Sequence, residues 1–328
     1  MLIKSLNINN LRNLKSVDIE LNPGLNFFIG DNGAGKTSVL ESIVVLAKGR
    51  SFRSGQVGAL IGPESEQFRV VATTALSGGR KRSLGIERGK SHWQARCDGE
   101  DVNQLSDLAA HLPLVLMEPN SHLLVSGPPE GRRKYLDWSV FHVEHDFLVN
   151  WRRYSRALKQ RNAALRSKDV QVLDSLDELL ANLGEKIALA RKAHVERLTP
   201  HLESMIAELS PELGDISIRY DDGWKGGSLI SALQVSRQRD LDRGITGPGP
   251  HKADFPIFQG RQLARERLSR GEQKTLSAAL LLSQARLLSD CGENPMLLMD
   301  DLAAEFDRSH LSAVLAVGLK MNAQLLSL

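Results

Sequence analysis

The sequence predicts an α/β fold in which a mixed sheet surrounds a glycine-rich loop, with a mainly helical lobe inserted into the chain. Three observations support this prediction. A short apolar segment, a glycine-rich loop and a helical pattern follow one another over residues 25–48. Short alternating runs at 68–97 are typical of an antiparallel meander. Residues 130–209 are expected to be almost entirely helical, and in the second part of this segment, over 172–198, apolar residues recur at spacings of three and four.

The glycine-rich loop has the sequence GDNGAGKT and fits the pattern G-x-x-x-x-G-K-[ST] at every fixed position. It lies between a predicted buried strand at 25–29 and a predicted helix at 37–48. Glycines let successive backbone N–H groups turn toward a polyphosphate, and the helix N-terminus adds partial positive charge. We therefore expect a nucleoside triphosphate site rather than a chance glycine-rich turn. Its expected contacts are Gly30, Asp31, Asn32, Gly33, Ala34, Gly35, Lys36, Thr37 and Ser38.

Three side chains near this loop have more specific expected roles. Lys36 reaches the terminal phosphates as a point charge, and Thr37 offers a hydroxyl ligand to Mg²⁺, which suits a hard cation. Arg12 lies in a polar link between strands expected at 2–9 and 17–21. Two interpretations of Arg12 stay open: a nucleotide contact, or a solvated link residue.

The composition is that of an ordinary globular protein. The chain has 328 residues, of which 41% are hydrophobic and 25% charged, and this predicts two or three domains. No apolar run approaches the roughly 20 residues of a membrane helix, and Cys97 and Cys291 have no motif spacing. We expect a cytoplasmic protein with reduced thiols and no membrane partner. The net charge of +3 permits nucleic-acid contact without demanding it.

We expect the domain that holds the glycine-rich loop to be built from two parts of the chain, an N-terminal part at 1–128 and a C-terminal part at 245–328. Between them we expect a helical lobe with short coiled-coil-like hairpins at 129–244. We expect a break or a kink at Thr199-Pro200 within the helical lobe. The chain ends in an apolar run, Gln324–Leu328, and we expect its C-terminal end to be truncated.

The helical lobe carries a basic segment without acidic residues. Trp151, Leu158 and Leu165 mark its core side at heptad spacing, so the basic residues are expected to face outward. Such a surface can follow a phosphate backbone, or it can be a solvated face balanced by the acidic residues that follow. The seven basic residues are Arg152, Arg153, Arg156, Lys159, Arg161, Arg166 and Lys168, of which Arg152, Arg153, Arg156 and Lys159 are the candidate DNA contacts.

A second anion site is expected at Leu268–Lys274, which precedes a long apolar helix. This segment, LSRGEQK, resembles the signature motif L-S-G-G-Q of ATP-binding-cassette ATPases. Ser269 and the N–H groups at Gly271 stand at a helix N-terminus, where anions bind. An ordinary serine N-cap is the alternative interpretation.

A pair of acids follows the apolar run Met296–Met299. This pattern predicts a buried parallel strand that presents carboxylates at its C-terminal end, where open α/β sheets bind ligands. Asp300 is the expected Mg²⁺ partner. Asp301, with Lys36, is expected to be catalytic, because it occupies the place of the carboxylate that orients or deprotonates the attacking water. Many ATP-binding-cassette ATPases have Glu at this place, so the shorter Asp301 predicts slow hydrolysis of the nucleotide.

Together these motifs resemble the RecF family of bacterial recombination and repair ATPases. They occur in order along nearly the whole chain, at 10–13, 30–37, 49–53, 131–137, 249–254, 268–274 and 300–301. The resemblance implies an ATP-binding-cassette head, related to the heads of chromosome-structure proteins, that uses ATP and Mg²⁺. In that family, Ser269 and Gly271 of one subunit would clamp the γ-phosphate held by another, which implies a homodimer in the ATP state.

The resemblance also implies a biological role. It implies binding to single-stranded DNA and to gapped or single-strand/double-strand junction DNA, with weak ATP hydrolysis that releases the dimer. It implies that RecO and RecR are partners in loading recombinase, with roles in replication and the SOS response. Asn120 follows a predicted strand where relatives place a γ-phosphate sensor, and no residue fills the switch position after the last strand.

Two other function classes stay open. The first is the ATPase subunit of a transporter, but such subunits usually stack an aromatic residue on adenine upstream of the loop. The first 26 residues contain no Phe, Tyr or Trp. The second is a non-hydrolysing structural clamp, which Asp301 and the chain end keep possible. Alternative DNA surfaces are Arg50 with Arg53, or Arg132 with Arg133.

Overall fold

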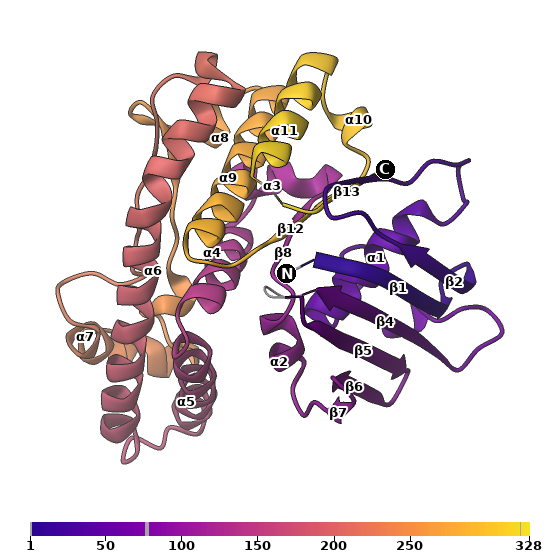
Figure 1. Ribbon diagram of the computed structural model, residues 1–328. Helices are drawn as coiled ribbons and strands as arrows, with labels where there is room; N and C mark the ends of the chain where they lie inside the picture. The colour runs from indigo at the N-terminus through magenta and orange to yellow at the C-terminus, as the bar shows by residue number, and fades with distance from the viewer. Residues whose placement is uncertain (1, 76–78, 322) are drawn as a thin grey trace. The chain divides into compact units, whose positions relative to one another are not determined.

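The computed structural model describes residues 2–75, 79–321 and 323–328 (Figure 1). Its internal contacts divide the chain into two compact units. The first consists of Met1–Ser121 and Ala278–Leu328, and the second of His122–Ser277. The helix α9 (Arg270–Asp290) belongs to both units, so the domain boundaries expected from the sequence stay predictions.

The first unit contains a six-stranded sheet in the order β2-β1-β4-β5-β6-β7, in which all neighbouring strands are antiparallel. The predicted meander is therefore confirmed. The strands are β1 (Leu2–Leu11), β2 (Leu14–Glu20), β4 (Gln67–Ala75), β5 (Lys81–Gly89), β6 (Trp93–Cys97) and β7 (Glu100–Asp101).

The hairpin between β1 and β2 is tighter than the sequence predicted. The expected polar link over residues 9–13 shrinks to a two-residue turn, Arg12-Asn13. Leu11 and Leu14, on either side of this turn, are 0% and 7% exposed. Because both leucines pack in the core, the strands stay paired up to the turn, and the turn is held in a fixed place.

A second sheet in this unit is parallel throughout, in the order β3-β13-β12-β8. Its central strand β12 is buried along its whole length, as predicted for Met296–Met299. The prediction of a buried strand at 25–29 is wrong in part, because Phe27 is 53% and Ile29 is 93% exposed. These residues belong to or follow the edge strand of the sheet. The strands are β3 (Leu25–Phe27), β8 (Leu114–Met117), β12 (Met296–Met299) and β13 (Leu325–Ser327).

The two sheets share one core and are joined by a buried amide. The core contains residues of both sheets and of α1 (Lys36–Lys48), for example Ile8, Ile43 and Leu298. The Gln324 side chain donates from Nε2 to the carbonyl oxygens of Ile3 and Asn22 and accepts from the Ile3 N–H, each at 2.8 Å. Helix α1 is therefore fixed relative to both sheets. The other helices of this unit are α2 (Leu105–Ala110), α10 (Leu302–Glu305) and α11 (Arg308–Lys320).

The second unit is mainly helical, and the helices predicted over 130–209 are confirmed. A small antiparallel sheet, in the order β11-β10-β9, completes it. Its elements are α3 (Leu123–Ser126), α4 (Pro129–Val143), α5 (Phe147–Ser167), α6 (Leu173–Leu209), β9 (Ile216–Ile218), α7 (Leu229–Arg243), β10 (Ile257–Gln259), β11 (Gln262–Leu263) and α8 (Ala264–Arg267). Short 3₁₀ turns in the two units are η1 (Val57–Ala59), η2 (Pro119–His122), η3 (Pro211–Leu213) and η4 (Pro250–Lys252).

Helix α6 is not broken at Pro200. A proline in a helix removes one hydrogen bond and costs about 3 kcal/mol. Leu198 and Leu202, on either side of it, are 0% and 1% exposed. Burial of side chains like these contributes about 1.5–3 kcal/mol each, which offsets the loss. The continuous helix gives the unit a long backbone against which α4, α5 and α7 pack.

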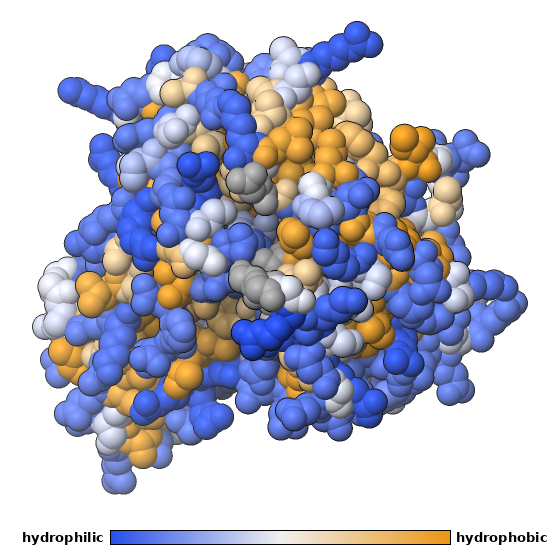
Figure 2. All heavy atoms as spheres, viewed as in Figure 1, coloured by the Kyte–Doolittle hydropathy of each residue, from blue (hydrophilic) through white to orange (hydrophobic). Residues whose placement is uncertain are grey.

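The surface in Figure 2 is mostly hydrophilic, with apolar side chains gathered over α11 and in smaller scattered groups. None of the helices described here combines the length and apolar character needed to cross a membrane.

Candidate functional site

The glycine-rich loop connects β3 to α1 and exposes most of its residues. Gly33 and Gly35 have φ angles of +83° and +99°, in the left-handed region that favours glycine. A Cβ on Gly35 would lie 2.6 Å from the Leu14 side chain, so the close approach also requires glycine there. Lys36 Nζ donates to the carbonyl oxygens of Gly30 (2.6 Å) and Asp31 (3.0 Å). The ammonium group is therefore held over the loop, where an anion would bind.

The turn of the β1–β2 hairpin supports this loop through Asn13. The Asn13 side chain donates from Nδ2 to the Gly33 carbonyl oxygen at 2.8 Å. Its Oδ1 accepts from the Ser38 hydroxyl, in the first turn of α1, at 3.1 Å. One amide therefore links the loop to the helix that follows it. The sequence analysis missed this residue, although it ends the 10–13 motif.

Arg12 is not a solvated link residue. Its guanidinium donates from Nε and Nη2 to the two carboxylate oxygens of Glu41, at 2.9 and 2.8 Å, and from Nη1 to the Ala59 carbonyl oxygen at 2.6 Å. The Glu41 side chain is fully buried. The hydrogen bond to Glu41 raises the pKa of Arg12. Arg12 thus fixes the hairpin on α1, and its contact with a nucleotide stays a prediction.

The paired acids lie at the carboxyl end of β12, as predicted. Asp300 is 6% exposed, and the nearby Thr37 side chain acts to lower the pKa of its carboxyl group. The pKa of Asp300 is raised, first by burial and then by the negative charge of Asp301. Asp301 is exposed and has a φ of +55°, unusual for a residue other than glycine. The structure therefore brings the loop threonine and the first acid together and leaves the second acid open to water.

These residues fit a magnesium ion. Asp300 Oδ1 is buried, and no hydrogen-bond partner for it occurs in the part of the chain that the structure describes. A cation beside this oxygen would satisfy it and would favour its charged form. Carboxylate and hydroxyl oxygens are ligands that Mg²⁺ prefers, and in nucleotide sites the phosphates and waters supply the rest. Among the described residues, no cluster of three His, Cys, Asp or Glu side chains suited to a metal occurs.

Two further charged residues belong to this edge of the sheet. Glu118 directly follows β8, the neighbour of β12. Burial raises its pKa, and the charge of Asp300 adds to this effect. Burial also lowers the pKa of Lys48, at the end of α1, to about 8, with a smaller contribution from Arg50, while Glu118 acts in the opposite direction. Glu118 was not among the residues predicted from the sequence, although its place directly after an apolar strand is a signal that could have pointed to it.

The second unit holds the other predicted anion site. Ser269 and Gly271 are exposed at the start of α9. The Ser269 hydroxyl accepts from the Glu272 N–H at 3.3 Å, and Glu272 accepts from the Ser269 N–H at 2.7 Å. This reciprocal pair is a capping box, which exposes the helix N-terminus in a defined shape. Binding of a partner's phosphate here stays a prediction.

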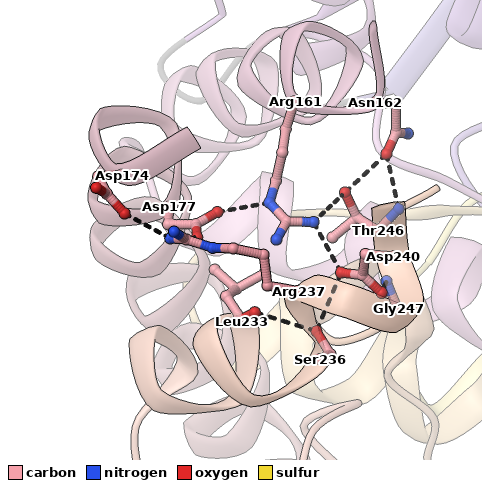
Figure 3. Close-up of polar contacts among 10 residues, drawn as sticks. All are labelled: Arg161, Asn162, Asp174, Asp177, Leu233, Ser236, Arg237, Asp240, Thr246 and Gly247. Atoms are coloured by element: carbon pink, nitrogen blue, oxygen red, sulfur yellow. Dashed lines mark hydrogen bonds and ion pairs between the residues drawn. The ribbon is translucent and has the colours of Figure 1, made fainter. Parts of the chain in front are cut away.

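The basic helix α5 agrees with the sequence analysis except at one residue. Arg152, Arg153, Arg156 and Lys159 are exposed, as expected. Arg161 is completely buried, so its predicted outward position is wrong. Its Nε donates to Asp177 at 2.5 Å and its Nη1 to Asp240 at 2.8 Å (Figure 3).

The buried face of α5 explains this correction. Tyr154, Ala157, Arg161 and Ala164 are all buried, at spacings of three and four, so the core side is rotated from the seam assumed in the sequence analysis. Arg161 falls within this face. Two carboxylates from α6 and α7 neutralise it, which makes the burial of a guanidinium possible.

The alternative DNA surface at Arg132 and Arg133 is also altered by the structure. Arg132 is only 3% exposed and forms a two-bond ion pair with Asp254, at 2.7 and 3.0 Å. It is therefore not available to a nucleic-acid backbone. Arg133 is half-buried and donates to the Ala253 carbonyl oxygen at 2.9 Å.

Comparison with known proteins gives the family. The model of the RecF/RecN/SMC N-terminal domain matches residues 2–326. The DNA replication and repair protein RecF of Stenotrophomonas maltophilia (strain R551-3) is 42% identical over 323 residues, which cover 96% of this chain and 89% of that protein. The chain belongs to the RecF family. RecF of Xanthomonas euvesicatoria pv. vesicatoria (strain 85-10) is also 42% identical, with 96% and 88% covered.

Solved structures agree with the RecF assignment. A structure of "the recombination mediator protein RecF-ATP in RecFOR pathway" has a TM-score of 0.90 at 26% identity and covers 100% of this chain and 91% of that one. An SMC head bound to the C-winged helix domain of ScpA has a TM-score of 0.57 at 14% identity, with 100% and 89% covered, and shares the fold. The predicted RecF-type head, an α/β fold related to SMC heads, is confirmed.

Proposed function

We propose that this RecF-family chain is an ATP-dependent DNA-binding protein of recombinational repair, in which ATP hydrolysis acts as a switch. One observation carries the proposal: the loop Gly30–Thr37 and the acids Asp300 and Asp301 lie at one edge of one parallel sheet, with Thr37 near enough to Asp300 to lower the pKa of its carboxyl group. A phosphate loop next to a buried carboxylate is the arrangement that MgATP requires. The ATP in the related RecF structure supports the choice of nucleotide.

Each residue has a distinct task in this proposal. The loop N–H groups and Lys36 bind the phosphates, while Thr37 and Asp300 hold the ion. When bound, Mg²⁺ supplies positive charge that stabilises the leaving phosphate. Asp301, exposed at the end of β12, orients the attacking water and accepts its proton.

The segment Leu268–Lys274, which resembles the signature motif, is proposed to contact the nucleotide of a second copy. Ser269 and Gly271 present an exposed helix N-terminus with a fixed cap. We propose that this anion site closes on the γ-phosphate held by a second copy, so that ATP joins two subunits into a homodimer. Hydrolysis removes the shared phosphate and releases them.

The proposed cargo is DNA, single-stranded or at gapped and single-strand/double-strand junctions. The exposed residues Arg153, Arg156 and Lys159 support this, because no ion-pair partner for them occurs among residues 2–75, 79–321 and 323–328. The names of the related proteins support roles in replication and repair, and the RecFOR pathway supports RecO and RecR as partners. A cytoplasmic location and a role in the SOS response belong to the same proposal.

The proposal is tested by binding to gapped DNA with and without MgATP. Wild type should bind more tightly with MgATP, and Lys36→Ala should lose this increase. Charge reversal of Arg153, Arg156 and Lys159 should weaken binding and flatten its salt dependence. Equal DNA affinity with and without MgATP would contradict the ATP-dependent part of the proposal. Unchanged binding by the triple variant would move the DNA contact away from α5.

Measuring phosphate release distinguishes the proposed ATPase switch from a clamp that binds ATP without hydrolysing it. Asp301→Asn should reduce the release rate at least tenfold while ATP still binds. Equal and negligible release by wild type and Asp301→Asn would favour the clamp.

A further inference from the structure

We propose a second contact for a phosphodiester backbone, on two loops of the second unit: residues 221–227 and 246–254, together called the paired loops. Lys225 and Lys252 are its cations, with Arg133 beside them. The proposal deepens the DNA-binding function proposed above and rests on it. Its first support is that buried side chains fix the loop 246–254 at its beginning, middle and end.

The beginning of the loop is fixed by the Arg161 network (Figure 3). Arg161 Nη1 donates to the Thr246 hydroxyl at 3.1 Å. Asn162 Oδ1 accepts from both the backbone N–H and the hydroxyl of Thr246, at 2.8 and 2.7 Å. The Gly247 N–H donates to Asp240 at 3.1 Å. The helix that carries the basic face on its outer side thus holds this loop with its inner side.

The middle of the loop is fixed by a second buried guanidinium. Arg191 is completely buried, forms two bonds to Asp137 at 2.7 and 2.9 Å, and donates to the Pro250 carbonyl oxygen at 2.6 Å. The Tyr154 hydroxyl is hydrogen-bonded to His251 Nδ1 at 2.8 Å. Burial lowers the pKa of His251 to about 4, so this ring is neutral near pH 7 and serves as part of the support.

The end of the loop 246–254 is hydrogen-bonded to the loop 221–227. The backbone groups of Asp221 and Asp254 exchange two hydrogen bonds, at 2.8 and 3.0 Å, and the Gly249 N–H donates to the Gly223 carbonyl oxygen at 3.1 Å. Arg132 neutralises Asp254, and Arg133 donates to the carbonyl oxygen of Ala253. The paired loops are therefore one rigid piece.

Two glycines show how closely the paired loops are packed. Gly223 has a φ of +88°, and a Cβ there would lie 2.4 Å from the Gly249 carbonyl oxygen. Gly249 has a φ of +138°, and a Cβ there would lie 2.4 Å from the Tyr154 hydroxyl. Backbone held in such conformations by many contacts is concentrated at functional sites.

The paired loops present positive charge to solvent. Lys225 and Lys252 are exposed, and within the described residues neither has an ion-pair partner. The competing carboxylates are Asp221, which accepts from the Gly223 N–H, and Asp222, which interacts with Lys192. Asp137 and Asp254 are already neutralised by buried arginines. The unpaired charges of the exposed surface are therefore mainly cationic.

The chemistry favours a nucleic-acid strand over an acidic protein segment. Trp224, directly before Lys225, is half-exposed, and its Nε1 donates to the Gly227 carbonyl oxygen at 3.1 Å, which fixes the ring. Gly226 and Gly227 have open space at their Cα atoms, so a backbone can approach closely. Cations that follow phosphates, with an aromatic face for a base, are the features of single-strand binding sites.

The test compares Lys225→Gln/Lys252→Gln with wild type in MgATP, using single-stranded oligonucleotides over a range of salt concentrations. Two lost phosphate contacts on a single strand should reduce the slope of log affinity against log salt by roughly 1.4. The matched control is Arg261→Gln, which removes an exposed cation of the same unit, at the β10–β11 turn. It should keep the wild-type slope. ATP affinity and the thermal midpoint should be unchanged in both variants.

The outcomes separate this inference from the function on which it rests. Wild-type slope and affinity in the double variant, while wild type binds DNA, would overturn the paired-loop site alone. Failure of wild type to bind DNA would overturn the proposed function and this site with it. If the double variant keeps DNA binding but loses binding to poly-L-glutamate, the surface belongs to an acidic protein partner and the inference is wrong. Lys225→Arg/Lys252→Arg should restore the slope.

Discussion

The phosphate loop depends on a residue that lies outside it. Asn13 bonds both the Gly33 carbonyl oxygen and the Ser38 hydroxyl. Without a ligand, a glycine-rich loop has many accessible conformations, and this amide holds the loop in one of them. Its effect should therefore appear in nucleotide affinity more than in folding.

We predict that Asn13→Ala weakens ATP binding about ten- to thirtyfold. It removes two hydrogen bonds, each of which contributes about 1 kcal/mol. The matched control is Asn9→Ala on the same hairpin, whose amide donates to the Asn7 side chain and not to the loop within the part of the chain that the structure describes. Titration calorimetry measures both affinities. Equal ATP affinity in wild type and Asn13→Ala would remove Asn13 from the site.

Helix α5 carries exposed arginines on its outer face and one buried arginine on the face that packs against α6 and α7. Arg156 is exposed, whereas Arg161 is enclosed between the carboxylates of Asp177 and Asp240. Arg237 supports Asp177 from the other side at 2.7 Å (Figure 3). The network ties α5, α6 and α7 together, so it determines how the basic face and the paired loops are held within this unit.

We predict that Arg161→Met lowers the free energy of unfolding by about 3–5 kcal/mol, because it leaves the buried Asp240 carboxylate without an arginine and removes one of the two arginines that bond Asp177. Arg156→Met is the control on the same helix and should change stability by less than about 0.5 kcal/mol. Urea unfolding measures both. Replacing Asp177 and Asp240 by leucine in the Arg161→Met background should recover much of the loss. A stable single variant would show that the network does not hold the helices.

Helix α6 contains a histidine that should make stability depend on pH. His194 is 2% exposed, and neither ring nitrogen has a hydrogen-bond partner among the residues described. Burial lowers its pKa to about 4, and the nearby Arg197 adds to this effect. The unfolded chain, with an ordinary pKa near 6.5, binds more protons between these values. The contribution of the neutral His194 ring to the free energy of unfolding is complete above pH 6.5 and is lost as the pH falls to 4.

We predict that His194→Phe reduces the acid sensitivity of unfolding. In wild type, this residue should lower the free energy of unfolding by about 3 kcal/mol between pH 6.5 and pH 4. His145→Phe, at an exposed position, is the control and should keep the wild-type dependence. Chemical unfolding at a series of pH values measures the difference. Parallel curves for wild type and His194→Phe would show that the ring is protonated without cost in the folded protein.

At the scale of the whole molecule, the sequence predicted those features that short patterns determine. The loop Gly30–Thr37, the strand Met296–Met299 and the helices of 130–209 each depend on neighbouring residues. Asn13 and Arg161 were missed or misplaced because their partners are distant. Arg161 meets Asp240 79 residues away, and Gln324 bonds Ile3 across 321 residues. Patterns of hydrophobicity carry no information about which distant carboxylate will neutralise a buried arginine.

In the proposed dimer, each chain supplies half of a nucleotide site. In the proposed switch, the helix N-terminus at Ser269 of one copy reaches the phosphate that Lys36 of another copy binds. Lys36→Ala should prevent assembly by weakening ATP binding, and Ser269→Arg by blocking the cap.

Light scattering of the purified protein with and without MgATP tests this claim most directly. We predict that wild type doubles its mass at saturating MgATP, that Lys36→Ala and Ser269→Arg stay monomeric, and that Arg261→Gln assembles like wild type. A wild type that stays monomeric in MgATP, or a Ser269→Arg variant that dimerises normally, would contradict the shared nucleotide site.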